Sequence, residues 1–222
     1  LGLDSSQQQV YSGKLLTLLA MGDRAGAKAA YAIGERQVGP ALPLLPLQPV
    51  YALTPLTWLL DRPQQARWLA SVQAAAARGI PGVFEDRIAQ YYWMLGDSVS
   101  GRTYAQAAKA SLETALAKNP AGYLLRVRLG LMLALLDQKR AAIEQGTQAV
   151  AALAGNDVLA SAAAKQVLAR IYLLAGEPEQ ALGLLESLLK GPGFLTPAWL
   201  RMDPTWGPLK GNPRFERLIA SR

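Results

Sequence analysis

The sequence predicts an all-α protein in which helices pair as antiparallel hairpins. Leucine and alanine dominate, β-branched residues are sparse and aromatic residues make up 7% of the 222 residues, a composition that favours helix. No stretch alternates apolar and polar residues on both sides of a tight turn, so we expect no β-hairpin. The clearest local signal is a helix, a turn and a returning helix over residues 165–189.

Residues 165–189 have the side chains that two closely packed helices need. Ala169 and Ala181 are small enough to let the helix axes approach. Tyr172 supplies a large apolar ring at the crossing. Gly176 can take the backbone conformation that ends the first helix, and Pro178 suits the start of the second. This spacing resembles a tetratricopeptide (TPR) repeat. The resemblance implies a right-handed superhelix (α-solenoid) of about four TPR-like hairpins, used as a binding scaffold.

The first hairpin is expected in residues 1–38. Helices are predicted over residues 7–21, after a serine cap, and over residues 24–37, with a turn at Gly22 and Asp23. The side chains that match the repeat spacing are Tyr11, Leu15, Leu18, Gly22, Ala27 and Tyr31. Lys14 stands where the repeat has an apolar residue.

Residues 39–60 are expected to be a proline-rich crossover, because five prolines between positions 40 and 55 forbid a regular helix. The stretch is also rich in leucine. It is therefore either packed on the core, with a short helix near residues 56–60, or an extended hydrophobic arm that occupies a groove or grips a partner.

Residues 61–192 are expected to hold the remaining hairpins. Helices are predicted over residues 63–78, 84–95, 104–118 and 123–136, with a loop at residues 96–101 that is longer than a standard repeat turn.

Two pairs of alanines in this array are separated by the TPR period. Ala108 precedes Ala142 by 34 residues, and Ala115 precedes Ala149 by the same distance. The spacing to Ala181 is longer, so the array is predicted to be degenerate.

Residues 193–222 carry a second resemblance, in addition to two short helices that each begin with a cap and a proline. The residues concerned are Leu200, Asp203-Pro204, Trp206, Pro208-Leu209, Pro213-Arg214-Phe215 and Leu218. They resemble the closing segment of TPR regions in bacterial regulators, where such regions follow TolB-like, winged-helix, adenylate-cyclase or serine/threonine-kinase domains. Gly207 and Lys210 stand where that family often has Asp and Arg. We expect a cap that seals the last hydrophobic face, or else a docking site for a neighbouring domain.

Composition restricts the chemistry. There is no cysteine and no histidine, so thiol chemistry, the commonest general base and the commonest metal ligand are missing. No phosphate-binding loop is present, and the adjacent carboxylates Glu85 and Asp86 point apart on a helix. No apolar run reaches the roughly 20 residues that span a bilayer. The chain starts at Leu1 rather than Met, and we expect it to be part of a longer protein. We therefore predict no catalytic residue, no metal site and no cofactor, and no membrane-spanning segment.

In a TPR array the first helices of successive hairpins line a concave groove, and the resemblance maps eight residues onto it. They are Gln90, Trp93, Met94, Val127, Leu131, Leu135, Gln166 and Arg170. An apolar groove with Arg170 at one end would suit an amphipathic helix, or an extended peptide with an acidic group. The alternative is that most of these residues are core, or are covered by the proline-rich segment.

The resemblance implies a non-catalytic interaction or sensor region of a bacterial regulatory protein, in signalling or transcription regulation. The partner would be a protein, a peptide or the chain's own N-terminal effector domain. Two alternatives stay open: a helical domain of a cell-envelope enzyme, and a nucleic-acid-binding module. The net charge of +7 permits the latter, but the sequence shows no cluster of basic and aromatic residues on one face.

Overall fold

A computed structural model describes residues 5–38, 56–77, 84–153 and 157–220. In these residues every regular element is a helix, as predicted. The chain forms two compact units: unit 1 contains residues 1–74 and 194–222, and unit 2 contains residues 75–193. Unit 1 thus combines the first and last parts of the chain, whereas the sequence suggests separate segments at 1–38 and 193–222.

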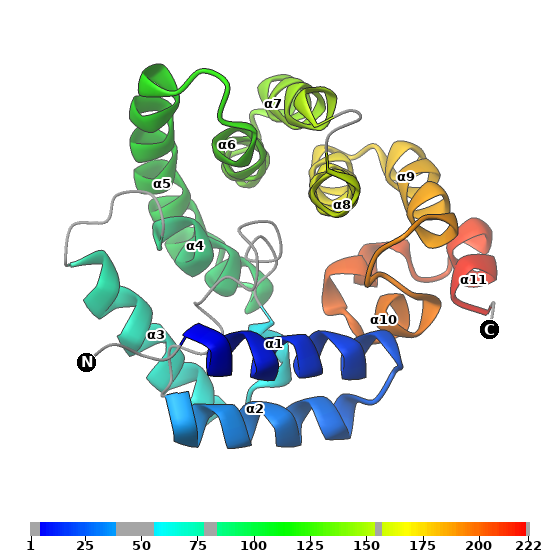
Figure 1. Cartoon of the computed structure of the whole chain (residues 1–222). Helices are drawn as coiled ribbons and strands as arrows, with labels where there is room; N and C mark the ends of the chain where they lie inside the picture. The colour runs from blue at the N-terminus through cyan, green and yellow to red at the C-terminus, as the bar shows by residue number, and fades with distance from the viewer. Residues whose placement is uncertain (1–4, 39–55, 78–83, 154–156, 221–222) are drawn as a thin grey trace. The chain divides into compact units, whose positions relative to one another are not determined.

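Unit 2 consists of three helical hairpins (Figure 1). Their helices are α4 (Glu85–Met94) with α5 (Ser98–Lys118), α6 (Tyr123–Leu135) with α7 (Lys139–Ala152), and α8 (Val158–Ala175) with α9 (Pro178–Lys190). Each helix packs on the next one along the chain, and α6 also contacts both α4 and α8. The first helices of the three hairpins therefore lie in one row, which we call the α4–α6–α8 row.

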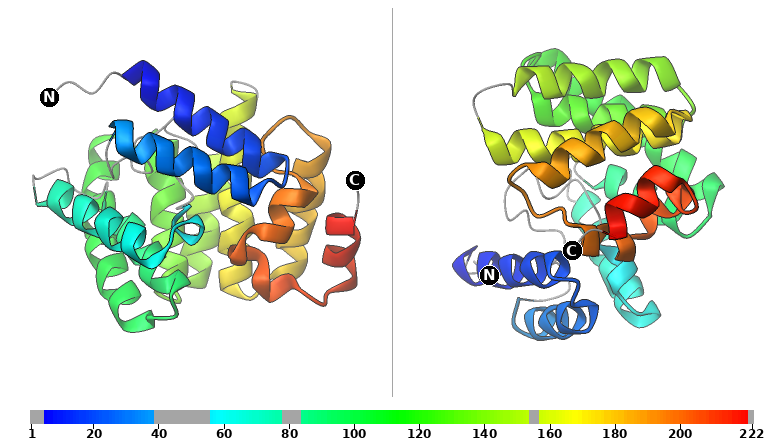
Figure 2. Two further views of the ribbon diagram at one scale, coloured as in Figure 1. Left: turned by 90° about the horizontal axis from the view of Figure 1, so that it is seen from below. Right: turned by 90° about the vertical axis from the view of Figure 1, so that its right-hand side faces the viewer.

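Unit 1 contains a further hairpin, α1 (Ser5–Ala20) with α2 (Arg24–Val38). Next come the short 3-10 helix η3 (Thr57–Leu59) and α3 (Arg62–Ala76). The last part of the unit holds α10 (Pro197–Met202), the 3-10 helix η4 (Pro204–Leu209) and α11 (Pro213–Ala220). Figure 2 shows α1 and α2 as the blue antiparallel pair, and α11 in red beside the orange α10.

All four hairpins turn on a residue with left-handed backbone conformation. These residues are Gly22, Gly96, Asp137 and Gly176, with φ of 82°, 79°, 62° and 84°. In each case the N–H of the left-handed residue donates to the carbonyl of the residue three positions before it. The N–H of the following residue donates to the carbonyl of the residue five positions before that following residue. These hydrogen bonds measure 2.8–3.2 Å. This is the Schellman pattern, which satisfies the last carbonyls of the first helix. The four turns therefore have one geometry.

Small residues at a constant distance from this turn let the paired helices approach. In each hairpin of unit 2, one small residue lies seven positions before the left-handed turn residue and another lies five positions after it. The three pairs are Ala89 with Gly101, Gly130 with Ala142, and Ala169 with Ala181. A Cβ atom added to Gly130 would lie 3.0 Å from the Ala142 carbonyl oxygen and 3.2 Å from the Gly146 nitrogen. At this crossing, α6 and α7 leave no room for a side chain.

The predicted long loop at residues 96–101 is wrong. Helix α5 begins at Ser98, because the Asp97 carboxylate accepts a hydrogen bond from the Ser100 backbone N–H at 3.0 Å and caps it. Hydrogen bonds from the hydroxyl and then the backbone of Ser100 lower the pKa of Asp97. Gly101 lies inside helix α5 and faces the backbone of α4. A Cβ atom added to it would lie 3.5 Å from the Ala89 carbonyl oxygen, so a small residue suits this position.

The 34-residue spacing of the alanines does not follow the turns. Ala108 lies 12 residues after the turn residue Gly96, whereas Ala142 lies only 5 after Asp137. The two alanines therefore occupy different positions in their hairpins. Helix α5 has 21 residues and α7 has 14, a difference of about two helical turns. Because of this extra length, the left-handed residues Gly96 and Asp137 are 41 positions apart instead of 34.

Unit 1 is held together by contacts between segments far apart in sequence. Arg67 of α3 makes a two-pronged ion pair with Glu35 of α2, Nε to Oε1 at 2.9 Å and Nη2 to Oε2 at 3.0 Å. The hydroxyl of Thr196, at the start of α10, donates to the carbonyl of Ala20 in α1 at 2.7 Å. A Cβ added to Gly22 would lie 3.0 Å from the Ala198 side chain. The C-terminal segment thus packs on the turn of the first hairpin.

The short elements at residues 56–60 and 193–222 contribute to this unit's core. Thr57, Trp58 and Leu59 are buried in η3, while the remainder of the proline-rich segment, residues 39–55, lies outside the described residues. Three of the predicted cap residues, Trp206, Leu209 and Phe215, are buried, and Leu218 is half-buried. They belong to the unit that contains the first hairpin.

We expect Gly130→Val to lower the free energy of unfolding by about 2 kcal/mol or more, because the new side chain meets the α7 backbone. The matched control is Gly183→Val in α9, since a Cβ there meets no atom within 4 Å. That change should leave stability equal or slightly higher. Chemical denaturation followed by circular dichroism measures both, and equal losses would refute the close crossing.

The buried Tyr31 of α2 predicts a pH effect, because its hydroxyl has no hydrogen-bond partner among the described residues. Burial, and then the charge of Glu35, raise the pKa of Tyr31 above its usual 10.0. The unfolded chain therefore loses this proton first, and the free energy of unfolding falls as the pH rises above 10.

We expect Tyr31→Phe to be at least as stable as wild type at neutral pH and to lose less stability on going to pH 11. Tryptophan fluorescence during urea unfolding suits the measurement, because four of the five tryptophans lie in unit 1. Equal losses in both proteins would contradict the burial of the hydroxyl.

Candidate functional site

The candidate site begins with three polar side chains on α4. Asp86, Arg87 and Gln90 are 3%, 7% and 5% exposed, although they are charged or polar. Asp86 and Gln90 lie four residues apart and therefore on one face of the helix. Asp86 also lies in the first turn, where the helix dipole stabilises a carboxylate. Buried polar groups need partners, and α6 and α8 supply them.

Arg128 of α6 forms a two-pronged ion pair with Asp86. Its Nε lies 2.7 Å from Oδ2, and its Nη2 lies 2.7 Å from Oδ1. The two side chains are 12% and 4% exposed, so solvent screens the pair little. This geometry matches the guanidinium to the carboxylate and fixes α6 against α4.

Arg170 of α8 extends the network to the third helix. Its Nη1 donates to Oε1 of Gln90 at 3.1 Å, and Nε2 of Gln90 donates to the backbone oxygen of Asp86 at 3.2 Å. Asp86 and Gln90 therefore connect the guanidinium groups of Arg128 and Arg170, which come from different helices. We call these four residues together with Arg87 the polar network of the α4–α6–α8 row.

The electrostatics of the network favour negative charge. The pKa of Arg87 is lowered to about 10, mainly by burial; the charge of Asp86 opposes this shift, and the charge of Arg128 adds to it. Burial also acts to lower the pKa of Arg128, but the charge and hydrogen bonds of Asp86, with the charge of Glu85, outweigh it and raise this pKa. At neutral pH the region holds three cationic guanidinium groups, with the carboxylates Asp86 and Glu85 beside them.

The structure brings together two of the eight predicted groove residues, Gln90 and Arg170, through their hydrogen bond. The three predicted residues of α6 lie in the core, since Val127 is 1% exposed and Leu131 and Leu135 are 2% exposed. They offer no open apolar surface in this conformation.

The other three predicted residues, Trp93, Met94 and Gln166, are half-buried. Trp93 faces its hairpin partner, because a Cβ added to Gly101 of α5 would lie 3.6 Å from the indole Cε3. Met94 and Gln166 keep part of their side-chain surface open to solvent. They lie one helical turn from Gln90 and Arg170, respectively.

Asp86, Arg87 and Arg128 are not among the predicted site residues. The sequence places Asp86 beside Glu85, but the two neighbours point to different sides of the helix. The available signal was the four-residue spacing of Asp86 and Gln90, together with Arg128 inside the apolar run of α6. This pattern indicates which polar side chains could be buried, but it does not indicate which of them interact. Arg128 lies 42 residues from Asp86 in the sequence, and Arg170 lies 80 residues from Gln90.

The described residues were also compared with the requirements of a metal site and of a membrane-spanning helix. Within them, no group of three or more acidic, histidine or cysteine side chains could hold a metal ion. One helix, α8, is long and apolar enough to span a membrane by length and composition, with a mean hydropathy of 1.4 over 18 residues. It packs against α6, α7 and α9 and contains the buried Arg170, as a core helix does.

Comparison of the chain with protein-family models, with curated proteins and with solved structures found no match.

We expect Asp86→Asn to lower the free energy of unfolding by about 3 kcal/mol, because it leaves the guanidinium of Arg128 buried without its countercharge. The control is Glu113→Gln, which removes an exposed carboxylate that lies 3.7 Å from the ammonium group of the half-buried Lys109. That change should cost less than about 0.5 kcal/mol. Urea denaturation of unit 2 in the full chain, followed by far-ultraviolet circular dichroism, separates the two effects. Similar small losses would show that the buried pair does not hold the row together.

Proposed function

We propose that this chain is a non-catalytic binding scaffold, and that its α4–α6–α8 row takes a peptide or a partner domain. The structural type would be a TPR-like α-solenoid. The observation that carries the proposal is the polar network, because it joins the first helices of three successive hairpins and gathers arginine side chains there.

The repeated hairpin supports the scaffold. All four hairpins share one turn geometry, and the three of unit 2 follow one another in the chain. Contacts run from α4 to α6 and from α6 to α8. Stacked repeats of this kind place equivalent helices next to each other and create an extended surface on one side.

The charge of the row supports an acidic group in the partner. Arg87 and Arg128 lie close to Asp86, and Arg170 joins the network through Gln90. The three guanidinium groups outnumber the carboxylates of Asp86 and Glu85, so a further carboxylate would meet a net positive field. Met94 and Gln166 would contact the partner beside the network. Their half-exposed side chains combine apolar surface and hydrogen-bonding capacity, as interaction surfaces do.

The regulatory part of the proposal rests on the tail resemblance alone. It makes this chain the interaction or sensor region of a bacterial regulatory protein, which would pass a binding event to an effector domain. The row itself supports binding and leaves the consequence of binding open.

A photo-crosslinking experiment tests the proposal. We would place a photoreactive amino acid at Met94 or Gln166 in the row, and at exposed positions on the second helices as controls. The control positions are Glu113, Thr147 and Gln180. In bacterial lysate, the row positions should crosslink to the same protein, because both contact one partner, while the control positions should not.

The crosslinked partner should also lose binding when Gln166 is replaced by Glu, because the added negative charge opposes an acidic group. Gln166→Lys should retain or strengthen binding. Crosslinks that form only at the control positions would move the binding surface to the second helices, and the absence of any crosslink at Met94 and Gln166 would refute binding through the row.

A further inference from the structure

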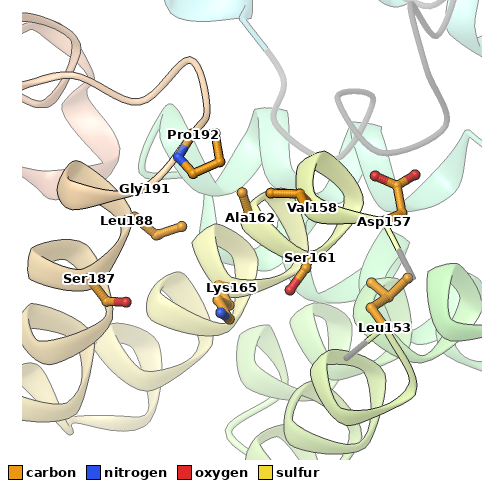
Figure 3. A pocket seen from close by; sticks show the side chains of 10 residues that line it. All are labelled: Leu153, Asp157, Val158, Ser161, Ala162, Lys165, Ser187, Leu188, Gly191 and Pro192. Carbon is orange, nitrogen blue, oxygen red and sulfur yellow. The ribbon is translucent and has the colours of Figure 1, made fainter. Parts of the chain in front are cut away.

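A pocket of about 310 Å³ lies in unit 2 between the beginning of α8 and the end of α9 (Figure 3). Its volume falls in the range of small-molecule sites. The apolar part of its wall comes from Leu153, Val158, Ala162, Leu188 and Pro192. Val158 is 64% exposed, although it is apolar. A molecule in the pocket would remove this side chain from water.

Three hydrogen-bond donors line the same pocket. Figure 3 shows Lys165 of α8 between Ser161 of the same helix and Ser187 of α9. Ser161 and Lys165 are four residues apart, on one face of α8. Among the described residues, none of these side chains takes part in a hydrogen bond or ion pair. The pocket therefore offers an ammonium group with one hydroxyl from α8 and one from α9.

The charge around the pocket restricts the ligand. Lys165 supplies one positive charge, and Asp157 supplies one negative charge at another part of the wall. The Asp157 carboxylate is engaged as the cap of α8, since it accepts the N–H of Ala160 at 2.9 Å. A dianion such as phosphate would meet this carboxylate as well as the ammonium group. A singly charged anion can bind at Lys165 and avoid it.

We propose that this pocket binds a small amphipathic carboxylate. The carboxylate accepts hydrogen bonds from Lys165 and from the hydroxyls of Ser161 and Ser187. The apolar tail lies against Val158, Ala162 and Leu188. The pocket residues of α8 all precede the half of the helix that carries Arg170, and none of them belongs to the polar network.

Titration calorimetry of the full chain with octanoate tests the proposal. Lys165→Met should weaken octanoate binding about tenfold or more, because the tail keeps its contacts while the charge-assisted hydrogen bond is lost. Lys165→Arg should stay within a few-fold of wild type, since it keeps the charge. The matched control is Lys118→Met, an exposed lysine at the end of α5 that should leave binding unchanged.

Two comparisons separate the parts of the ligand. Octanol has the same tail without the charge and should bind about tenfold more weakly than octanoate. Ala162→Phe should abolish octanoate binding by filling the pocket, with an unchanged circular dichroism spectrum as the test of folding.

The proposal is overturned if wild type does not bind octanoate, if Lys118→Met weakens binding as much as Lys165→Met, or if octanol binds as well as octanoate. Crosslinking at Met94 and Gln166 is measured without octanoate, so the pocket and the row can fail independently.

Discussion

The left-handed residue at each hairpin turn is the constraint on which the rest of the molecule depends. It reverses the chain within a very short link, and so it sets which residues of the two helices face each other. Where both facing residues are small, as at Gly130 and Ala142, the backbones come into contact. Repetition of this unit then places α4, α6 and α8 in one row. The charged side chains of the row meet because their helices are held this closely.

The polar network contributes specificity more than stability. Removing Asp86 and Arg128 from water costs free energy that their attraction returns only because the pair is aligned on both oxygens. The bonds from Arg128 to Asp86 and from Arg170 to Gln90 select one register. A partner that contacts Met94 and Gln166 would therefore meet helices held in a preformed arrangement, which lowers the entropy cost of binding.

Local patterns in the sequence predict the helices and hairpins well, because caps, glycines and small residues act within a few positions. Gly22 and Gly176 are recognisable turn residues, whereas Asp137 is not, since aspartate tolerates the left-handed region without being diagnostic of it. The alanine spacing was misleading because two additional helical turns in α5 keep the same face inward while they shift the register. The network was beyond prediction, because the pairing of Asp86 with Arg128 depends on packing across 42 residues.

The hydrogen bond from Thr196 to Ala20 joins residues 176 positions apart. During synthesis the first hairpin leaves the ribosome long before the segment that packs on it exists, whereas unit 2 is complete once residue 193 has emerged. Unit 2 can therefore fold while the chain is still being made, and unit 1 must wait for its last residues. Until then the part of α1 and of its turn that α10 covers stays exposed to water and open to other binding partners, such as chaperones.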